Sequence, residues 1–472
     1  MAGKYENKGN PKKRRRRRKR SSLLVCILVP LLCAGIFGTW MISQLPGFRY
    51  IGKKLPEYPD TREELQTEPS EEVLQTQPKE TEPGRKVATA TIGATGDILL
   101  HDLVIKSGYD EETDSYNFDN IFKWFSKYVS EVDYAAANLE GTLAGKDNGY
   151  PYSGYPSFNA PDEIVDATKN AGFDLLLTAN NHTYDTGIDG FNRTQQVIVE
   201  RGLDHLGTRQ KKADLNYTIR DLSGIKVGMT CYTYCSAYNT AGNFKLNNIS
   251  LPESASKRVN AFHYKDLETF YSKLAGELQG MNVDGAEVRV VFIHWGTEYK
   301  TVPNESQKKI AQRLCDLGVD VIVGNHAHVA QPVELLTSST FAAHKTLCIY
   351  STGNAVSNIY RSKNFPAQTE DGMLFRFTLA KYSDGTVLVE SADVLPTWVH
   401  RYDDEQGIRK FQILALEEGA DWQSDMGLTD EILKECEESY DRTMEIVGKG
   451  LEEANAWFVQ QQEEKEIELG MK

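Results

Sequence analysis

Side chains able to bind a metal or move a proton gather directly after five apolar, strand-like runs of the sequence. They are Asp97 with His101, Glu140, Asn180 to His182 with Asp185, His294 with Glu298, and His326 with His328. The chain has nine histidines, and five of them stand in these positions. In an open α/β sheet the loops after the strands meet outside the carboxyl edge. We therefore expect these side chains to converge on one site.

The types of donor in this set predict a metal centre. Imidazoles, carboxylates and an amide oxygen suit Zn, Mn or Fe better than Ca or Mg. His326 and His328 stand two residues apart on an expected loop and can aim two imidazoles at neighbouring points. One such histidine alone would more often be a core or surface residue, so the prediction depends on the whole cluster. A serine hydrolase is not expected, because the sequence has no G-x-S-x-G elbow.

Alternating strand-like and helix-like patterns would position these residues. Strands are expected at residues 87–95, 134–137, 173–178, 288–293, 319–323 and 346–350, and helices at 118–132, 162–172, 187–202, 264–278 and 305–317. Asn304 and Gln307 form a capping-box pattern, and Gly318 stands where that helix should stop. Strands that alternate with helices indicate crossover connections, and so an α/β fold with a largely buried sheet.

Two hairpins and a C-terminal region complete the expected organisation. Residues 217–219 with 225–232, and 373–380 with 386–394, are strand-like pairs separated by short turns. Beyond about residue 403 the sequence is acidic, and a long helical pattern covers residues 430–468. We interpret residues 87–402 as the main domain and 403–472 as a helical C-terminal appendage.

The ordered motifs resemble a known family. They are Gly96-Asp97, Asn138-Leu139-Glu140, Asn180-Asn181-His182, His294-Trp295-Gly296 and His326-x-His328, and together they resemble the CapA family of bacterial capsule (poly-gamma-glutamate) biosynthesis proteins. That family is similar in turn to the calcineurin-like metallophosphoesterases. The resemblance covers about residues 88–358. It implies a four-layer α/β/β/α sandwich, with two sheets face to face, and a dinuclear metal site.

The resemblance also implies roles for single residues. The metal ligands would be Asp97, His101, Glu140, Asn181, His294, His326 and His328. His182 would protonate a leaving group or steady the attacked centre. The sequence departs from the phosphoesterase pattern at His101, which follows Asp97 by four positions instead of two, and at Glu140, where Asp is usual. Asn325 precedes His326 where CapA-like chains often have His, and the expected number of ions is one or two.

A second set of residues lies close to these motifs in the sequence. Asn180, Asp185, Glu298, Gln331 and Asn354 would orient the ligands or contact substrate. Ordinary hydrogen bonding within loops is the alternative for each of them. Gly353, after an expected strand, would permit close approach of the backbone.

The N-terminus predicts a membrane anchor. Residues 1–20 hold eleven basic residues and one acid, and the apolar residues 23–42 would span about 30 Å at 1.5 Å per residue. The positive-inside rule then leaves residues 1–22 in the cytoplasm and the rest of the chain outside. A nucleic-acid patch and a cleaved signal peptide are weaker alternatives, because the basic run abuts a spanning segment without a small-residue cleavage site. Residues 43–86, acidic and containing prolines, are expected to form an extended stalk.

Charge and cysteine content bound the remaining classes. The net charge of −14 combines +10 in residues 1–20 with −24 elsewhere, of which residues 417–472 carry −12. No nucleic-acid partner is expected; the expected partners are the bilayer, an anionic cell-surface polymer or its precursor, and membrane-bound polymer synthase subunits. Seven scattered cysteines are too few for a disulfide scaffold. Cys315 and Cys348 are expected as buried thiols, whereas pairing of Cys231 with Cys235 stays open.

Three functions compete at this point. The first is an outward-facing, metal-dependent hydrolase of the phosphoesterase type that acts in capsule polymer assembly, as the resemblance implies. The second is a non-catalytic binding or scaffolding subunit with a structural metal. The third is an amide-bond hydrolase or transferase that acts on poly-gamma-glutamate. Fold alone does not choose among them.

Overall fold

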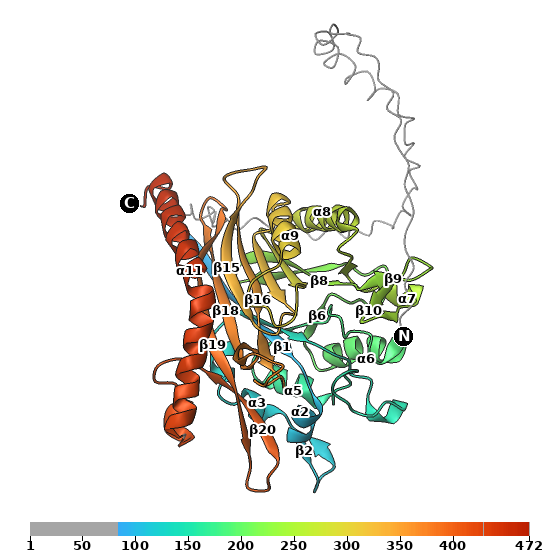
Figure 1. The fold of residues 1–472 in the computed structure, drawn as a ribbon. Coiled ribbons are helices and arrows are strands. Elements are labelled where there is room, and N and C mark those ends of the chain that lie inside the picture. Colours follow the sequence, from blue (N-terminus) through green and yellow to red (C-terminus); the bar gives the residue numbers. More distant parts are fainter. Residues whose placement is uncertain (1–83, 428, 472) are drawn as a thin grey trace, which may run out of the picture. The chain divides into compact units, whose positions relative to one another are not determined.

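The computed structural model describes residues 84–427 and 429–471, whose strands form two large sheets (Figure 1). Across the first sheet the order is β20 (Arg409–Ala415), β19 (Val387–Asp403), β18 (Asp371–Tyr382), β1 (Lys86–Ile98), β4 (Tyr134–Leu139), β5 (Leu175–Leu177) and β6 (Asp204–Leu206), with β17 (Asn354–Val356) also paired to β1. The strands β1, β4, β5 and β6 run parallel, and β18, β19 and β20 are antiparallel to their neighbours. Crossover helices are needed only in the parallel half.

The second sheet is mostly parallel. Its order is β12 (Ala261–Phe262), β8 (Ile225–Tyr234), β13 (Val288–His294), β14 (Val321–Asn325), β16 (Lys345–Thr352) and β15 (Ala330–Thr337), with β7 (Tyr217–Leu222) paired to β8. Only β15 and β7 run antiparallel to the strands beside them. The expected hairpins of β7 with β8 and of β18 with β19 are therefore confirmed.

Three apolar clusters show that the sheets and helices form four layers. One cluster lies between the sheets, one joins the second sheet to α8 (Leu267–Val283) and α9 (Glu305–Asp316), and one joins the first sheet to α3 (Asp119–Phe122), α4 (Ser126–Val129), α5 (Glu163–Asn170) and α6 (Gly187–Glu200). Successive residues of a strand point to opposite faces. Accordingly Val290 of β13 faces the other sheet, and Val291 faces the helices. The expected α/β/β/α arrangement is present.

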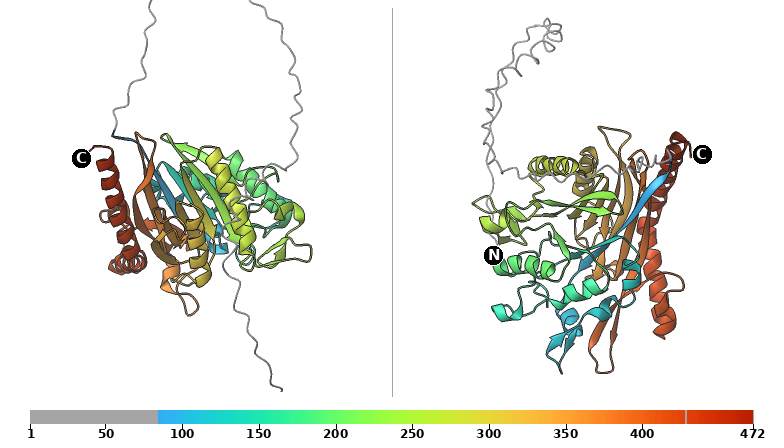
Figure 2. Two further views of the ribbon diagram at one scale, coloured as in Figure 1. Left: turned by 90° about the horizontal axis from the view of Figure 1, so that it is seen from above. Right: turned by 180° about the vertical axis from the view of Figure 1, so that it is seen from behind.

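The C-terminal region differs from the expectation. Residues 409–415 are not helical but form β20, and β19 continues to Asp403. The long helix α11 (Asp430–Glu468) has the expected bounds, yet it is no appendage. Its residues Val447, Ala454 and Phe458 are buried in the cluster between the sheets, and α11 lies along β15, β18 and β19 (Figures 1 and 2).

Other helices follow the sequence patterns with local changes. The capping box of α9 is present: the Asn304 side chain accepts from the Gln307 backbone, and the Gln307 side chain accepts from the Asn304 backbone. The expected helix at 118–132 is instead two short helices, α3 and α4, because the chain turns between Phe122 and Ser126. Short elements fill the loops: α2 (Asp102–Ser107), β2 (Tyr109–Asp110), β3 (Ser115–Tyr116), β9 (Ala237–Tyr238), β10 (Phe244–Leu246), β11 (Ile249–Ser250), α7 (Glu253–Ser256) and α10 (Asp421–Asp425).

Predictions for the N-terminus fall outside the described residues. This holds for the cytoplasmic segment 1–22, the spanning segment 23–42 and almost all of the stalk 43–86. Among residues 84–427 and 429–471, no helix combines the length and apolar character needed to cross a bilayer. In the same residues the cysteines at 231, 235, 315, 348 and 436 are all buried and free, which confirms the expectation for Cys315 and Cys348.

Candidate metal centre

Strand ends of the two sheets meet at one buried centre. In the first sheet, Asp97 of β1 lies in register with Asn138 of β4 and with Asn354 of β17. In the second sheet, His294 of β13 lies in register with Asn325 of β14. The two edges touch, because Asn325 Nδ2 donates to Asp97 Oδ1 at 3.1 Å. The convergence expected from the strand ends is thus observed across both sheets.

Two adjoining groups of donor atoms in this centre could each hold a metal ion. One group consists of Glu140, His294 and His326, and the other of Asp97, Glu140 and His328; within each group the ligand atoms lie within 4.8 Å of one another. His326 Nδ1 lies 3.1 Å from His294 Nε2, and His328 Nδ1 lies 3.1 Å from Asp97 Oδ2. Glu140 belongs to both groups, which is the arrangement that a carboxylate bridging two ions requires.

The state of Glu140 fits a divalent cation. Its side chain is buried, and neither carboxylate oxygen has a hydrogen-bond partner. Burial tends to raise the pKa of Glu140, but the positive charges of His294 and His328 outweigh it and lower the pKa overall. A buried polar group without a partner costs about 1–3 kcal/mol, and more if it is charged. A cation bound between the two groups would remove that cost.

The loop after β14 that carries His326 and His328, here called the histidine loop, also suits metal binding. Burial, together with the neighbouring His294 and His328, lowers the pKa of His326 well below its usual value, so the ring is neutral and its lone pair is available to a metal. His326 and His328 have positive φ angles of 94° and 56°. Such backbone conformations are unfavourable for side chains other than glycine and cluster at functional sites. The loop thus holds two imidazoles at the centre at the cost of backbone strain.

Amide side chains surround the carboxylate and imidazole ligands. Asn181 Oδ1 lies 2.7 Å from His294 Nε2, which places an amide oxygen at the centre. Asn138 Nδ2 donates to Asp97 Oδ1 at 2.7 Å, beside the similar bond from Asn325. Hydrogen bonds of this kind fix the orientation of a ligating carboxylate.

Two glycines let β1 and the strands after the histidine loop approach closely. A Cβ atom on Gly96 would lie 2.0 Å from the Gly353 carbonyl oxygen, which accepts from the Asp97 backbone N–H at 3.1 Å. Gly353 itself has a φ of 75°, which glycine adopts without strain. This close approach of the backbone at Gly96 and Gly353 positions the Asp97 backbone, and a contact of Gly353 with substrate stays a prediction.

His182 stands beside the metal groups and contacts a buried carboxylate. Its Nδ1 lies 2.7 Å from Asp185 Oδ2, which also accepts from the Phe158 backbone N–H at 2.8 Å. Burial lowers the pKa of His182, but the Asp185 carboxylate outweighs burial and raises the pKa overall. Asn180 ties this loop to its neighbour: its Nδ2 donates to the Leu139 carbonyl at 2.8 Å, and its Oδ1 accepts from the His182 backbone N–H at 3.1 Å.

Four other expected site residues lie around the centre in different settings. His101 belongs to neither metal group; its Nδ1 accepts from the Asn358 backbone N–H at 3.2 Å, and burial lowers its pKa to about 4. Asn354 Oδ1 lies 3.0 Å from His328 Nδ1. Gln331 bonds Gln307 and the Lys300 carbonyl, each at 2.7 Å, so it holds a loop and no ligand. Glu298 is exposed; burial lowers the pKa of His328, but the carboxylates of Glu140 and Asp97, with a smaller contribution from Glu298, outweigh burial and raise the pKa to about 9.

Several residues at the centre were not expected from the sequence. Tyr234 packs its ring 4.8 Å from that of His326, and Tyr299 lies 6.0 Å from that of His328. Asn247, from a distant hairpin, bonds Asn181 and His182. Tyr234 ends strand β8, so the rule about strand ends would have found it. Asn247 carries no such signal, because it lies in a turn between two very short strands.

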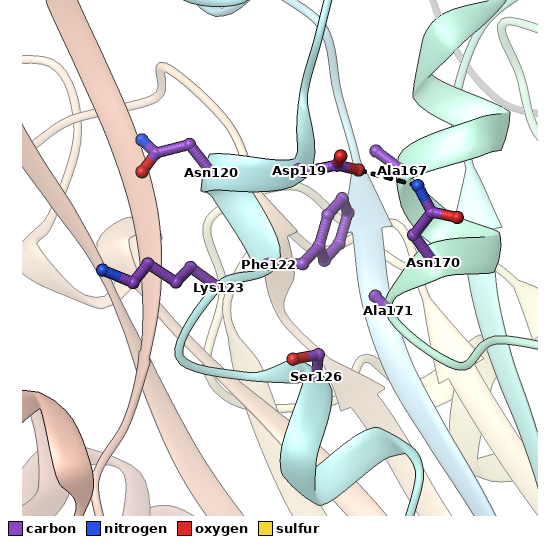
Figure 3. A pocket seen from close by; sticks show the side chains of 8 residues that line it. All are labelled: Asp119, Asn120, Phe122, Lys123, Ser126, Ala167, Asn170 and Ala171. Atoms are coloured by element: carbon purple, nitrogen blue, oxygen red, sulfur yellow. Dashed lines mark hydrogen bonds between the residues drawn. The ribbon is translucent and has the colours of Figure 1, made fainter.

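A separate hollow of about 360 Å³ lies between α3 and α5 (Figure 3). Its lining includes Phe122, Lys123 and Ala171, and Asn170 Nδ2 donates to Asp119 Oδ1 across it at 3.1 Å. None of the metal-group residues lines this hollow. It therefore belongs to the packing of the outer helices and not to the centre.

The fold and the centre together define a four-layer α/β protein whose buried imidazole and carboxylate groups are compatible with a divalent metal. The model of the family described as "Bacterial capsule synthesis protein PGA_cap" matches residues 91–359, more than half of the chain, and the chain belongs to this family. The resemblance to CapA proteins seen in the motifs is thereby confirmed.

Curated relatives agree with this family. The chain is 25% identical over 311 residues to the "PGA biosynthesis protein CapA" of Bacillus subtilis (strain 168), which covers 66% of this chain and 74% of the relative. It is 28% identical over 307 residues to the "Capsule biosynthesis protein CapA" of Bacillus anthracis. That alignment covers 63% of this chain and 66% of the relative.

Solved structures give more distant likenesses. A putative 5'-nucleotidase from Staphylococcus aureus has a TM-score of 0.40 and 12% identity, covering 75% of this chain and 58% of that one. An NAD nucleotidase from Haemophilus influenzae has a TM-score of 0.39 and 10% identity, covering 81% of this chain and 68% of that one.

Proposed function

We propose that this capsule synthesis family member is a metal-dependent hydrolase of the phosphoesterase type that acts on an anionic capsule polymer or its precursor. The observation that carries the proposal is Glu140, a buried carboxylate without a hydrogen-bond donor that is shared by two groups of ligand atoms. A divalent ion there, most simply Mn, Zn or Fe, would supply Lewis acidity and a water of lowered pKa. The donor set of imidazoles, carboxylates and one amide oxygen agrees with these metals.

The chain's own residues would divide the remaining work. Asp97, Glu140, His294, His326 and His328 would hold the metal, and Asn181 would add its amide oxygen. Asp185 accepts from His182 Nδ1, so the proton that His182 can transfer is the one on Nε2. In phosphoester cleavage, water would attack phosphorus and release one proton to solvent, the bond to the leaving oxygen would break, and that oxygen would take the Nε2 proton, which solvent would then return to His182. A raised pKa keeps His182 able to carry this proton near neutral pH.

We further propose that the chain is anchored in the cell membrane by residues 23–42, with its main domain outside and with polymer synthase subunits as neighbours. The apolar length of this segment and the basic run before it support the proposal. Protease treatment of intact cells tests it: the domain should be cleaved while an epitope at the N-terminus stays protected. Protection of both ends would contradict this topology.

The test of catalysis uses the purified full-length chain. Bound Mn, Zn and Fe are measured first, and turnover of phosphomonoester, phosphodiester and poly-gamma-glutamate substrates is measured next. Asp97→Ala and His326→Ala should lose metal and turnover together. Asp119→Ala is the matched control, because Asp119 lines the hollow between α3 and α5 and should leave both unchanged.

The outcomes separate the competing functions. Wild-type protein that binds no metal would overturn the metal-dependent hydrolase. Metal binding without turnover, with normal capsule in cells that carry Asp97→Ala, would favour a scaffolding subunit. Release of glutamate from poly-gamma-glutamate, with no phosphoester turnover, would favour amide-bond chemistry at the same centre.

A further inference from the structure

A small three-stranded sheet outside the main sandwich reaches into the metal centre. It consists of β9, β10 and β11, and the turn between β10 and β11 contains Asn247 and Asn248. Both residues have positive φ, 44° and 65°, a conformation that asparagine tolerates better than most residues. Leu246 and Leu251 pack this sheet against Phe191 of α6. Figure 1 shows β9, β10 and α7 on the same side of the molecule as α6. The turn is thus fixed against α6, the helix that follows the loop carrying His182.

The Asn247 side chain contacts two residues of the centre at once. Its Oδ1 accepts from Asn181 Nδ2 at 3.2 Å, and its Nδ2 lies 3.2 Å from His182 Nε2 and 3.3 Å from His182 Nδ1. His182 Nδ1 carries a hydrogen, because it faces the Asp185 carboxylate. Asn247 Nδ2 is almost equally distant from the two ring nitrogens, so it contacts the ring as a whole, and the Asn247 amide is oriented by the hydrogen bond that its Oδ1 accepts from Asn181.

The consequence for Asn181 is geometric. An amide binds a metal through its oxygen, and a flipped amide would present its NH₂ group instead. Because Asn247 occupies the Nδ2 side of Asn181, the Asn181 oxygen is left facing His294 Nε2, at 2.7 Å. Partners of this type commonly change metal affinity by about 10- to 100-fold when they are removed.

We infer that Asn247 is a positioning residue of the metal centre: it fixes the Asn181 oxygen toward the metal and holds the His182 ring. The inference rests on the proposed metal-dependent function and adds to it an element, the β9–β11 sheet, that lies outside the motifs of the family resemblance. The centre is therefore completed by a hairpin that neither large sheet provides.

The test compares two glycine substitutions in one turn. Asn247→Gly and Asn248→Gly both relieve positive φ, so their backbone effects match. The two side chains differ: Asn247 bonds residues of the centre, whereas Asn248, among the described residues, forms a hydrogen bond to Ser236 Oγ through its backbone N–H only. Mn²⁺ affinity of the metal-free full-length chain is measured by calorimetry, with its thermal midpoint as a fold control. Asn247→Gly should weaken Mn²⁺ binding about 10-fold, and Asn248→Gly less than about 2-fold. Asn247→Asp keeps an acceptor for Asn181 Nδ2 and should recover most of the affinity.

Each outcome decides the inference. Wild-type affinity in Asn247→Gly, or an equal loss in Asn248→Gly, overturns it and leaves the metal centre standing. Failure of the Asn247→Asp rescue also overturns it, since the lost hydrogen bond to Asn181 is then not the cause. Absence of Mn²⁺ binding in the wild type overturns the proposed metal-dependent function and this inference together.

Discussion

Two buried glutamates in this chain have opposite surroundings. Glu140, at the metal centre, has no hydrogen-bond donor on either oxygen. Glu370, beneath α11, accepts from the Arg361 backbone N–H and guanidinium at 2.8 to 3.1 Å and from Trp398 Nε1 at 3.2 Å. Both side chains are almost wholly inaccessible to solvent. The fold supplies hydrogen-bond donors for the carboxylate that it uses structurally, whereas the contact of Glu140 Oε1 with His294 Nε2, at 3.5 Å, is an ion pair without a hydrogen bond.

The largest expected effect separates these two glutamates directly. Glu140→Gln should weaken Mn²⁺ binding about 100-fold or more, because it removes the charge that both metal groups share. Glu370→Gln should keep metal affinity within a few-fold and lower stability instead, because Arg361 loses the buried one of its two ionised partners and keeps only Glu435. Calorimetric titration and urea unfolding of both variants measure the contrast. Equal losses of metal affinity would remove the distinction between the two sites.

The next largest effect is expected on stability, at the contact between α11 and Asp371 of β18, which we call the α11 seam. Arg442 Nε and Nη2 bond the buried Asp371 carboxylate at 2.8 and 2.7 Å, and Ser439 Oγ donates to it at 2.6 Å. Arg442→Met leaves Asp371 without its cation and should cost about 3 kcal/mol of unfolding free energy. Lys449→Met, on the exposed face of the same helix, should cost less than about 0.5 kcal/mol. Urea unfolding that finds similar costs would show that the seam is not a structural ion pair.

A buried histidine outside the metal centre, His400, should make the stability of the protein depend on pH. His400 of β19 is buried with no partner for Nδ1, and burial lowers its pKa from 6.5 to about 4. As the pH falls from about 6.5 to 4, the unfolded chain takes up a proton that the folded chain does not, so stability is lost over this range, up to about 3 kcal/mol. His400→Phe should remove that part of the pH dependence. The measurement is urea unfolding of metal-free protein at pH 7.5 and 4.5; an unchanged difference between wild type and variant would contradict it.

The smallest predicted effect on stability concerns the N-cap of α9, which the sequence pattern of Asn304 and Gln307 predicted. Asn304→Ala removes the N-cap hydrogen bond of α9 and should cost about 1 kcal/mol. Lys309→Ala, exposed on the same helix, should change stability by less than about 0.5 kcal/mol. Thermal unfolding of the two variants is sufficient. If Asn304→Ala lowered metal affinity as well as stability, α9 would have a direct part in supporting the metal centre, beyond the hydrogen bond between Gln307 and Gln331.

Much of the centre could be predicted because its residues obey a local rule. Asp97, Glu140, His294, His326 and His328 follow parallel strands, and such strands must bring their ends together. His101 departs from the rule because the chain has already turned into α2, whose first residue is Asp102, so its ring lies beside the ligands instead of among them.

The unpredicted parts are those without a local pattern. The strands β9 to β11 have two or three residues each, too few to show an alternation. In β20 the alternation of Phe411, Ile413 and Ala415 is present, but it covers only a few residues and an acidic, helix-like sequence follows soon after it. The role of α11 in the core depends on which surface it covers, and a helical pattern does not specify that surface.

The position of α11 has a consequence for the order in which the chain can fold. The core between the sheets begins with Ala90 and Ile92 of β1 and is completed by Val447, Ala454 and Phe458. Folding therefore depends on contacts between parts of the chain that are far apart in the sequence, such as β1 with β18 and α11 with β15, and such contacts form slowly. A nascent chain that lacks its last 40 or so residues exposes part of that core. Intermediates that expose apolar surface are prone to aggregate, so we expect α11 to protect this core from aggregation once it has packed.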